Sequence, residues 1–389
     1  MEQKKSKMKI VIIANGYPGK REPQWGCFER DQAVALTELG HQVSILYVDR
    51  RFRTYWRKIG INYRREDGID VCGVFLFPFL KLAHLNFQFH FRIVSKMLDW
   101  AFRCLVKRTG MPDVIYAHYL YNISFATHLK EKYHIPLVGI EHWSELTMDT
   151  LTPFVRFHGN VAYHKADKIL AVSESLQSHI KRHFDIDSTV VYDMLGPEFV
   201  HSGKDVRKEG TETFRFISVG SLLPIKNYDI LIRAFAKTGL SNEDCTLLIV
   251  GDGTERIKLE NIVRELHLEK NVCLVGRKSK SDIVRLLSES HVFVLSSKAE
   301  TFGVACIEAL SQGLSAIATK CGGPEEFINE SNGILVPAND VDVLTEAMTK
   351  MHDTYDSYDR TAIAKECLCK FSPSVIAKQL TSIFEEVAG

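Results

Sequence analysis

The 389-residue sequence has no apolar run of the ~18 residues that a membrane-spanning helix requires. Its start, MEQKKSKMKI, is basic but leads straight into the apolar segment KIVIIA. It lacks the separate apolar region and cleavage site of a signal peptide. These absences predict a cytoplasmic chain, for which peripheral contact with the inner face of the membrane stays open.

Paired cysteines and a charge excess are also lacking. The nine cysteines stand as singles apart from Cys367 and Cys369, and none has the C-x-x-C spacing of a zinc or redox site. This pattern indicates reduced thiols that fill the core. The formal net charge is only +1, so a general attraction to nucleic acid is not indicated.

The sequence does contain a regular alternation of short apolar runs with longer helical patterns. The runs form two series, at 9–14, 43–48, 71–77, 113–118, 136–141 and 168–173, then at 214–220, 246–251, 271–276, 291–296, 315–320 and 333–337. Strands that are apolar throughout, each followed by a helix, are typical of parallel sheets covered on both faces. The sequence therefore predicts an α/β fold in which this arrangement occurs twice.

The segment 196–212 separates the two series and is polar, charged and interrupted by glycine and proline. We therefore predict two Rossmann-like domains in tandem, over 1–197 and 198–371, with a final helix in 372–389 whose return to the first domain stays open. Ligands of such sheets bind beyond the carboxyl ends of the strands, and domain clefts are favoured sites. The active site is expected in the inter-domain cleft, with 196–212 as one hinge candidate.

Several polar residues follow the predicted strands of the second half. Glu300 and Glu308, in ETFGVACIE, suit sugar or ribose hydroxyls because a carboxylate only accepts hydrogen bonds. Lys226, Gly251 and Gly253 suit a diphosphate, which needs a cation and a closely approaching backbone. A solvated helix face, a solvated lysine and a common D-G turn explain the same residues when each is taken alone.

An ordered set of segments resembles the retaining GT-B glycosyltransferases of family 4. The segment that resembles their E-x7-E motif is ETFGVACIEALSQGLSAIATKCGGPEEFI, and those that precede it in the family's order include VGSLLPIKNYDILIRAF and LIVGDGTERIKLE. The first half is similar in GYPGKREPQWGCFERDQAVALTELGHQVSIL, DVIYAHYLY and PLVGIEHWSEL. The resemblance covers nearly the whole chain and implies the GT-B architecture.

The resemblance also implies roles for single residues. Glu300 corresponds to the glutamate that contacts donor-sugar hydroxyls, Glu308 to the one that binds the ribose, and Lys226 to the diphosphate lysine. His142 corresponds to the active-site histidine, so His142 and Glu300 are the catalytic candidates. The remaining candidate donor-binding positions are Gly26, Ser221, Gly251, Gly253, Arg277, Thr301, Phe302 and Gly303.

Ser221 departs from the family, which commonly has an arginine at this position beside the diphosphate lysine. A hydroxyl cannot replace a guanidinium as a fixed, bidentate cation. Either another cation works with Lys226, for which Arg277 is the candidate, or stabilisation of the leaving group is weaker.

The implied reaction transfers a sugar from a nucleoside diphosphate to an acceptor hydroxyl with retained configuration, in surface-polysaccharide or lipid-linked glycan assembly. A UDP-sugar is the expected donor, and a GDP-mannose-dependent mannosyltransferase is the alternative. No cofactor and no metal are expected. The D-x-D metal signature occurs at Asp185 to Asp187 and at Asp340 to Asp342, but neither site lies at a predicted nucleotide loop.

The acceptor side is expected in the first domain. His118, at a strand end, is one candidate, and a structural histidine is the equal alternative. Segments 50–65 and 75–92 combine basic and aromatic residues, which fits contact with anionic lipid or equally a buried helix beside a solvated stretch. The candidate patch residues are Arg50, Arg51, Arg53, Arg57 and Lys58.

Two other classes of protein stay open. A non-transferase enzyme acting on sugar nucleotides, such as an epimerase, would share the double Rossmann plan but not the E-x7-E context. A nucleic-acid-binding protein would use the 50–65 cluster, although the even net charge and the lack of a recognised module argue against it.

Overall fold

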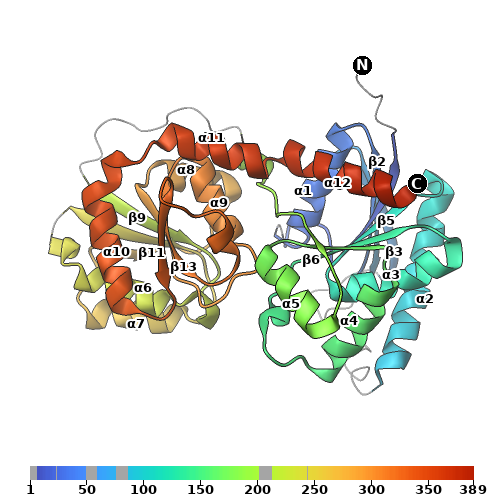
Figure 1. The fold of residues 1–389 in the computed structure, drawn as a ribbon, viewed down its shortest axis with the longest axis horizontal. Helices are drawn as coiled ribbons and strands as arrows, with labels where there is room; N and C mark the ends of the chain where they lie inside the picture. Colours follow the sequence, from blue (N-terminus) through green and yellow to red (C-terminus); the bar gives the residue numbers. More distant parts are fainter. Residues whose placement is uncertain (1–6, 23, 50–58, 76–85, 201–212, 243) are drawn as a thin grey trace. The chain divides into compact units, whose positions relative to one another are not determined.

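The computed structural model describes residues 7–22, 24–49, 59–75, 86–200, 213–242 and 244–389 (Figure 1). The chain divides into two compact units. Unit 1 comprises residues 1–192 and 373–389, and unit 2 comprises residues 193–372. Each unit has its own largely parallel sheet with helices between the strands, so the predicted α/β class with two Rossmann-like domains is confirmed.

Unit 1 contains an eight-stranded sheet in the order β3-β4-β2-β1-β5-β6-β7-β8, in which only the pair β3 and β4 is antiparallel. The strands are β1 (Lys9–Ala14), β2 (Gln42–Asp49), β3 (Gly60–Glu66), β4 (Ile69–Phe75), β5 (Val114–His118), β6 (Leu137–Glu141), β7 (Lys168–Ala171) and β8 (Thr189–Val190). Every residue of β5 and β6 is buried, which explains why these runs are apolar almost throughout.

Six α-helices occur among the described residues of unit 1. They are α1 (Cys27–Glu38), α2 (Phe87–Thr109), α3 (Leu120–Tyr133), α4 (Pro153–Lys165), α5 (Glu174–Phe184) and α12 (Pro373–Ala388). Helix α3 packs against both α2 and α4, and α1 packs against α12 (Figure 1). Within the described residues, no helix combines the length and apolarity needed to cross a bilayer.

Helix α12, although last in the chain, is built into unit 1. Its Phe384 is fully buried, with its ring centroid 5.0 Å from that of Tyr116 on β5. Its Thr381 Oγ1 lies 3.0 Å from Nε2 of His41, in a buried hydrogen bond. Helix α12 therefore forms part of the core of unit 1.

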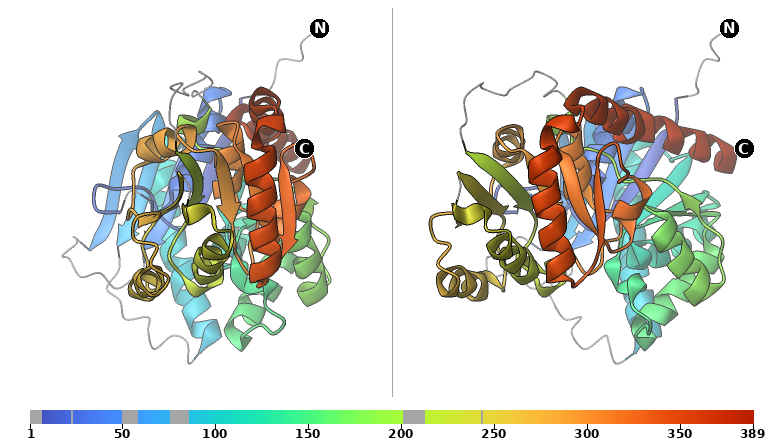
Figure 2. Two further views of the ribbon diagram at one scale, coloured as in Figure 1. Left: turned by 90° about the vertical axis from the view of Figure 1, so that its left-hand side faces the viewer. Right: turned by 60° about the vertical axis from the view of Figure 1, so that its left-hand side comes forward.

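Unit 2 contains a six-stranded, wholly parallel sheet in the order β11-β10-β9-β12-β13-β14. The strands are β9 (Phe214–Val219), β10 (Cys245–Val250), β11 (Val272–Leu274), β12 (Val292–Leu295), β13 (Ser315–Lys320) and β14 (Gly333–Pro337). The helices are α6 (Tyr228–Lys237), α7 (Arg256–Glu265), α8 (Lys280–Ser288), α9 (Val304–Ser311), α10 (Val341–Thr354) and α11 (Arg360–Phe371). Helix α6 packs against α7 and α10, whereas α9 packs against α11 (Figure 2).

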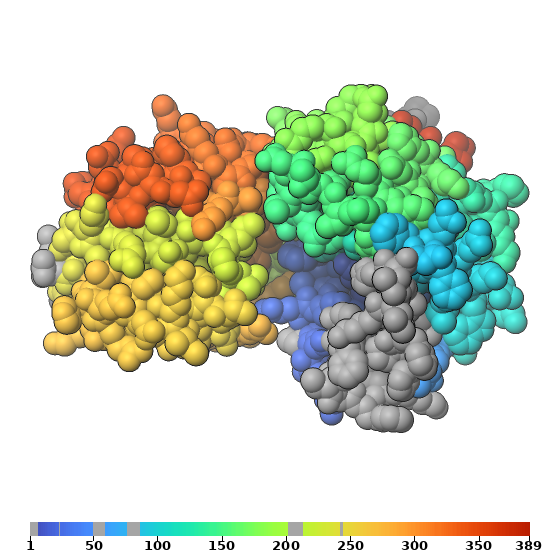
Figure 3. All heavy atoms as spheres, turned by 90° about the horizontal axis from the view of Figure 1, so that it is seen from below, coloured from blue at the N-terminus to red at the C-terminus, as the bar shows by residue number. Residues whose placement is uncertain are grey.

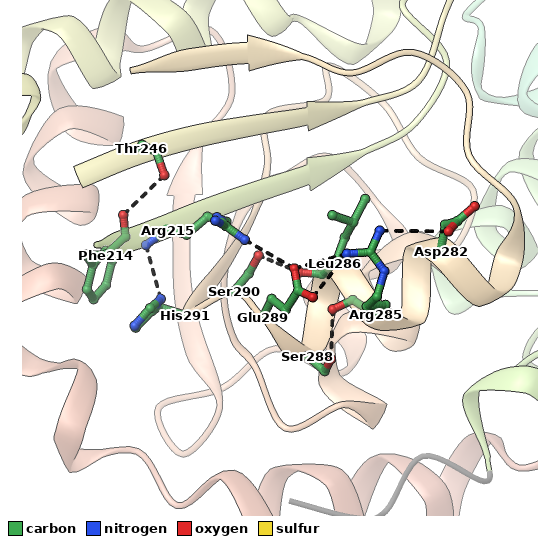
Figure 4. A network of polar contacts seen from close by, with 10 residues as sticks. All are labelled: Phe214, Arg215, Thr246, Asp282, Arg285, Leu286, Ser288, Glu289, Ser290 and His291. Atoms are coloured by element: carbon green, nitrogen blue, oxygen red, sulfur yellow. Dashed lines mark hydrogen bonds and ion pairs between the residues drawn. The ribbon is translucent and has the colours of Figure 1, made fainter. Parts of the chain in front are cut away.

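The amino-terminal edge of this sheet is fixed by a polar network (Figure 4). The backbone N–H of Arg215 on β9 donates to Nδ1 of His291, which precedes β12, at 3.1 Å. The Arg215 guanidinium lies 3.6 Å from Glu289, which also accepts from Arg285 on α8 at 3.1 Å. This network lies at the amino-terminal edge of the sheet, so its residues do not contribute to the carboxyl-terminal edge.

Two strands were not predicted, the seven-residue β3 and the two-residue β8. The described part of the 50–65 segment is not a helix: residues 60–66 pair antiparallel with β4 as an edge strand. The turn between them is Asp67-Gly68, and both residues have positive φ, at 52° and 77°. A D-G pair in this conformation is a strong hairpin signal, and it is present in the sequence between the two strands.

The docking of α12 on unit 1 gives a stability prediction. Phe384→Ala removes a fully buried ring and should lower the free energy of unfolding by about 3–5 kcal/mol. Lys378→Ala, on the exposed side of the same helix, should change it by about 0.5 kcal/mol or less. Urea unfolding followed by tryptophan fluorescence reports on unit 1, because all four tryptophans belong to it. Equal shifts for the two variants would contradict the packing described above.

Candidate active site

The strand order of unit 2 reverses between β9 and β12. From β9 the chain adds β10 and then β11 on one side, and from β12 it adds β13 and β14 on the other. The connections after these two neighbouring strands therefore diverge. Open parallel sheets bind their ligands at the carboxyl ends of two such strands. Lys226 follows β9 and Glu300 follows β12, so both stand at this point.

Lys226 and Glu300 form an ion pair across the switch point. The Lys226 Nζ lies 2.5 Å from Glu300 Oε1, and the Ser297 hydroxyl donates to the same oxygen at 2.6 Å. The Glu300 side chain is only 11% exposed and that of Lys226 26%. Glu300 Oε2 accepts no hydrogen bond from the described residues. The carboxylate is thus neutralised on one oxygen and remains an acceptor on the other.

Backbone hydrogen bonds fix the loops that carry this pair. The Lys298 N–H donates to the carbonyl of Ile225 at 2.8 Å, which joins the loops after β12 and β9. The Glu300 N–H donates to the carbonyl of Cys321 at 2.8 Å, which joins the loops after β12 and β13. Three loops from adjacent strands are therefore tied together around Glu300.

The Phe-Gly pair after Glu300 packs the base of this loop. The Phe302 side chain is buried against the rings of Phe327 and Phe371, with centroids 5.3 and 5.5 Å away. Gly303 begins α9 with φ of 100°, a conformation that favours glycine. A Cβ on Gly323 would lie 2.3 Å from the Phe302 backbone, so the two loops touch directly. The aromatic ring of Phe302 is thus part of the core of unit 2.

Gly251 and Gly253 are required by a neighbouring loop. A Cβ on Gly251, whose φ is 152°, would lie 1.8 Å from the carbonyl oxygen of Gly220. A Cβ on Gly253 would lie 2.4 Å from the carbonyl oxygen of Leu222. The glycines therefore let the loops after β10 and β9 pack backbone to backbone, and an additional role beside a ligand stays a prediction.

The other donor-side candidates are less constrained. Ser221 is exposed, Thr301 is half-buried, and Glu308 is half-buried on α9. Arg277 is exposed and makes no ion pair or hydrogen bond with the described residues. It follows β11, two strands from β9 and so about 10 Å away across the sheet. Within the described residues no contact joins Arg277 to the Lys226–Glu300 pair, and its role beside a diphosphate stays a prediction.

The aspartates of the two D-x-D sequences serve other contacts. Asp340 caps the first turn of α10 by accepting from two backbone N–H groups, and Asp342 pairs with Lys237. Asp185 and Asp187 both pair with Lys181. These contacts account for the four residues as local structure.

Unit 1 has its own reversal of strand order, between β1 and β5. Asn122 Nδ2 bridges the two strand ends, donating to Asn15 Oδ1 at 3.0 Å and to the carbonyl of His118 at 2.9 Å. Gly26, at the start of α1, has φ of 76°, and a Cβ there would lie 2.4 Å from the Gly16 backbone. The loop after β1 is thereby held against the first turn of α1.

His118 and His142 form a pair at the ends of β5 and β6. His118 Nδ1 lies 3.2 Å from His142 Nε2, and the two ring planes differ by only 6°. His118 is completely buried, and burial together with the neighbouring His142 holds its pKa well below the usual 6.5. His118 is therefore neutral at physiological pH, and its Nε2 has no hydrogen-bond partner among the described residues.

The lack of a partner for the buried Nε2 of His118 indicates which histidine donates the hydrogen bond between the two rings. If His142 donated, His118 would carry its own proton on Nε2 as an unpaired buried N–H, which is rarer than an unpaired acceptor. The favourable arrangement has His118 Nδ1–H donating to His142 Nε2. A neutral His142 then carries its proton on Nδ1 and acts there as a hydrogen-bond donor.

Glu141 supports the backbone at His142 and was not predicted from the sequence. It is fully buried at the end of β6, and its Oε1 accepts from the backbone N–H groups of His142 and Trp143 at 3.0 Å each. Its Oε2 accepts from the Tyr163 hydroxyl at 2.8 Å. Burial raises the pKa of this carboxyl, and the Tyr163 hydrogen bond lowers it. The signal was present in PLVGIE, where a carboxylate ends an apolar strand.

The patch residues Arg50, Arg51, Arg53, Arg57 and Lys58 lie outside the described residues. The same is true of residues 76–85 in the second basic–aromatic segment. A lipid-contacting role for the five cations stays a prediction.

The tautomer of His142 can be tested directly. Long-range ¹H–¹⁵N spectra of the imidazole rings, assigned with His142→Gln, should show His142 protonated on Nδ1. His118→Asn keeps an amide N–H near the position of Nδ1 and should preserve that pattern. His118→Leu removes the donor and should release Nε2 for protonation. A wild-type spectrum with His142 protonated on Nε2 would contradict the assignment.

The lowered pKa of His118 predicts a pH dependence of stability. Below its ordinary pKa of about 6.5 the unfolded chain takes up a proton that the folded chain does not, so stability is lost as pH falls. His118→Asn should reduce this loss by up to about 1.4 kcal/mol per pH unit below 6.5. Urea unfolding at a series of pH values measures it, with His164→Asn, at an exposed position of α4, as control. An unchanged slope in His118→Asn would refute the expectation.

Known proteins resemble the chain in both sequence and structure. The family model "Glycosyltransferase Family 4" matches residues 30–193, and "Glycosyl transferases group 1" matches residues 203–366. N-acetyl-alpha-D-glucosaminyl L-malate synthase of Bacillus anthracis is 26% identical over 401 residues, which cover 98% of each chain.

Solved structures also match nearly the whole fold. Sucrose-phosphate synthase of Thermosynechococcus elongatus has a TM-score of 0.78 at 18% identity, covering 98% of this chain and 99% of that one. HepE of Anabaena, in complex with UDP and glucose, has a TM-score of 0.73 at 19% identity, covering 97% and 100%. With the two family models spanning most of the sequence, the chain belongs to the GT-B glycosyltransferases of family 4.

Proposed function

We propose that this glycosyltransferase takes the sugar of a UDP-sugar and transfers it, with retained configuration, to an acceptor hydroxyl. The observation that carries the proposal is the Lys226–Glu300 pair at the β9/β12 switch point. Its half-satisfied carboxylate suits the hydroxyls of a sugar, and its lysine suits the diphosphate attached to that sugar. The Anabaena structure, which is described with UDP and glucose, supports uridine as the base.

In the proposed reaction the bond from the anomeric carbon to the β-phosphate oxygen breaks, and its electron pair leaves with UDP. The acceptor oxygen bonds to the anomeric carbon, and its proton passes to the departing phosphate. Lys226 donates to this phosphate through the N–H groups that Glu300 does not occupy. The first turn of α9, which has no side-chain cap, presents further N–H donors at the same edge. On this proposal the leaving charge needs no metal.

Glu300 and His142 would orient the reacting sugar. The Oε2 of Glu300 accepts from a sugar hydroxyl, and the pairing of Oε1 with Lys226 and Ser297 holds the carboxylate in place. His142, with its proton on Nδ1, donates to an oxygen of donor or acceptor and is not the general base. We assign Glu308 to the ribose hydroxyls. We place the reaction in the assembly of a surface polysaccharide or a lipid-linked glycan.

Substitutions of the two glutamates should have different effects on the affinities for UDP and for the UDP-sugar. Glu308→Gln should weaken UDP and the UDP-sugar alike, whereas Glu300→Gln should weaken the UDP-sugar relative to UDP. The expected loss is about tenfold to a hundredfold, because hydrogen bonds to charged groups contribute about 1.5–3 kcal/mol. Calorimetric titration measures the affinities, and Glu346→Gln on the exposed side of α10 is the matched control.

The donor base is tested by thermal shift with UDP-, GDP- and ADP-sugars, since a ligand of the native state raises the midpoint of unfolding. If GDP-mannose alone raised the unfolding midpoint, the donor base would be guanosine and not uridine, and the transferase proposal would still hold. Equal weakening of UDP and UDP-sugar in Glu300→Gln would remove the sugar-binding role. If no nucleotide sugar changed the unfolding midpoint, the assignment of a donor site to unit 2 would be refuted.

A further inference from the structure

Helix α2 presents an unusual stripe to solvent. Six of its exposed residues, at spacings of three and four, lie on one face: Phe89, Arg92, Lys96, Trp100, Arg103 and Lys107. At 100° per residue they fall within about 80° of one another, and at 1.5 Å per residue they extend over about 27 Å. We call this set the α2 stripe. Figure 3 shows the light-blue atoms of this part of the chain at the surface.

The charge of the stripe is of one sign. Arg92, Lys96 and Lys107 form no ion pair with the described residues, and Arg103 contacts Asp99 at 3.5 Å. Asp99 is the only acidic residue of α2. It is buried and already bound by Lys132 at 2.8 Å, so it does not neutralise the stripe.

A cationic helix face alone is ordinary, but its aromatic residues are not. Phe89 is 58% exposed and Trp100 is 42% exposed, although the opposite side of the same helix supplies fully buried residues such as Phe102 and Leu105. The fold of unit 1 therefore does not need the two outer rings. Aromatic rings between cations are the combination that suits a lipid interface, where the rings enter the headgroup region and the cations meet anionic lipid.

The stripe lies beside the acceptor-side residues of unit 1. Helix α2 follows β4, so it starts at the same edge of the sheet as His118 and His142. Ring contacts run from its first turn toward these histidines. Phe87 packs on Phe154 at 5.3 Å, Phe154 on Tyr121 at 5.2 Å, and Tyr121 on Trp143 at 4.9 Å. A surface that held the stripe would thus be close to the acceptor side of the sheet.

We propose that the α2 stripe is a docking surface for an anionic lipid bilayer. It brings the acceptor-side edge of unit 1 to the plane in which a membrane-bound hydroxyl acceptor lies. The occupant follows from charge complementarity and from the exposed rings, and the proposal does not depend on which nucleotide the enzyme uses.

Vesicle flotation of the full chain tests the stripe. Wild type should float with phosphatidylglycerol-containing vesicles, not with pure phosphatidylcholine, and more strongly at low ionic strength. Each Lys or Arg near such a surface contributes about fivefold to partitioning, so Lys96→Gln with Lys107→Gln should weaken it about 25-fold. Trp100→Gln with Phe89→Gln should also weaken it, with less dependence on salt.

The matched control is Lys350→Gln with Lys378→Gln, which removes the same charge from exposed positions on α10 and α12 and should leave flotation unchanged. Urea unfolding of every variant checks folding independently of the donor, because the substituted side chains are exposed. The proposal fails if wild type does not float at low ionic strength, or if stripe and control variants lose binding equally. It also fails if duplex DNA binds the stripe with the same variant dependence as the vesicles, since the face would then serve nucleic acid.

Discussion

The reversal of strand order in each sheet is the constraint on which the candidate residues of each unit depend. Between β9 and β12, and between β1 and β5, neighbouring parallel strands send their connections in opposite directions. The carboxyl ends at these points are left without a covering crossover, so polar side chains can gather there. Lys226 with Glu300 occupies one reversal, and Asn15 with His118 occupies the other. The polar residues assigned to the reaction thus lie at the points where the strand order of each sheet reverses.

Buried polar groups keep these edges rigid before any ligand arrives. Glu141 holds the backbone that carries His142, and His118 holds its ring, so the histidine is fixed from two sides. In unit 2 the glycines allow loops to touch backbone to backbone, and Ser297 holds the carboxylate of Glu300. Because the loops are already ordered, little of the free energy of ligand binding is lost to ordering them.

Much of this organisation could be predicted from the sequence, because the interior strands are buried on both faces and their apolar runs are unmistakable. Strand β3 was missed because an edge strand with one polar face lacks such a run, and its D-G turn was overlooked. The ion pair between Lys226 and Glu300 could not be derived from local pattern, since it joins residues 74 positions apart. The pairing of His118 with His142 likewise depends on the register of β5 beside β6, which brings two distant strand ends together.

Hydrogen exchange with and without UDP-sugar tests the central claim most directly, because it reports which backbone segments a ligand protects. If the donor binds at the β9/β12 reversal, exchange should slow at 220–228, 296–307 and 321–327. The network at the opposite edge, around Arg215 and His291, should not change. Protection at that opposite edge, with none in the three loops, would contradict the assignment of Lys226 and Glu300 to the donor.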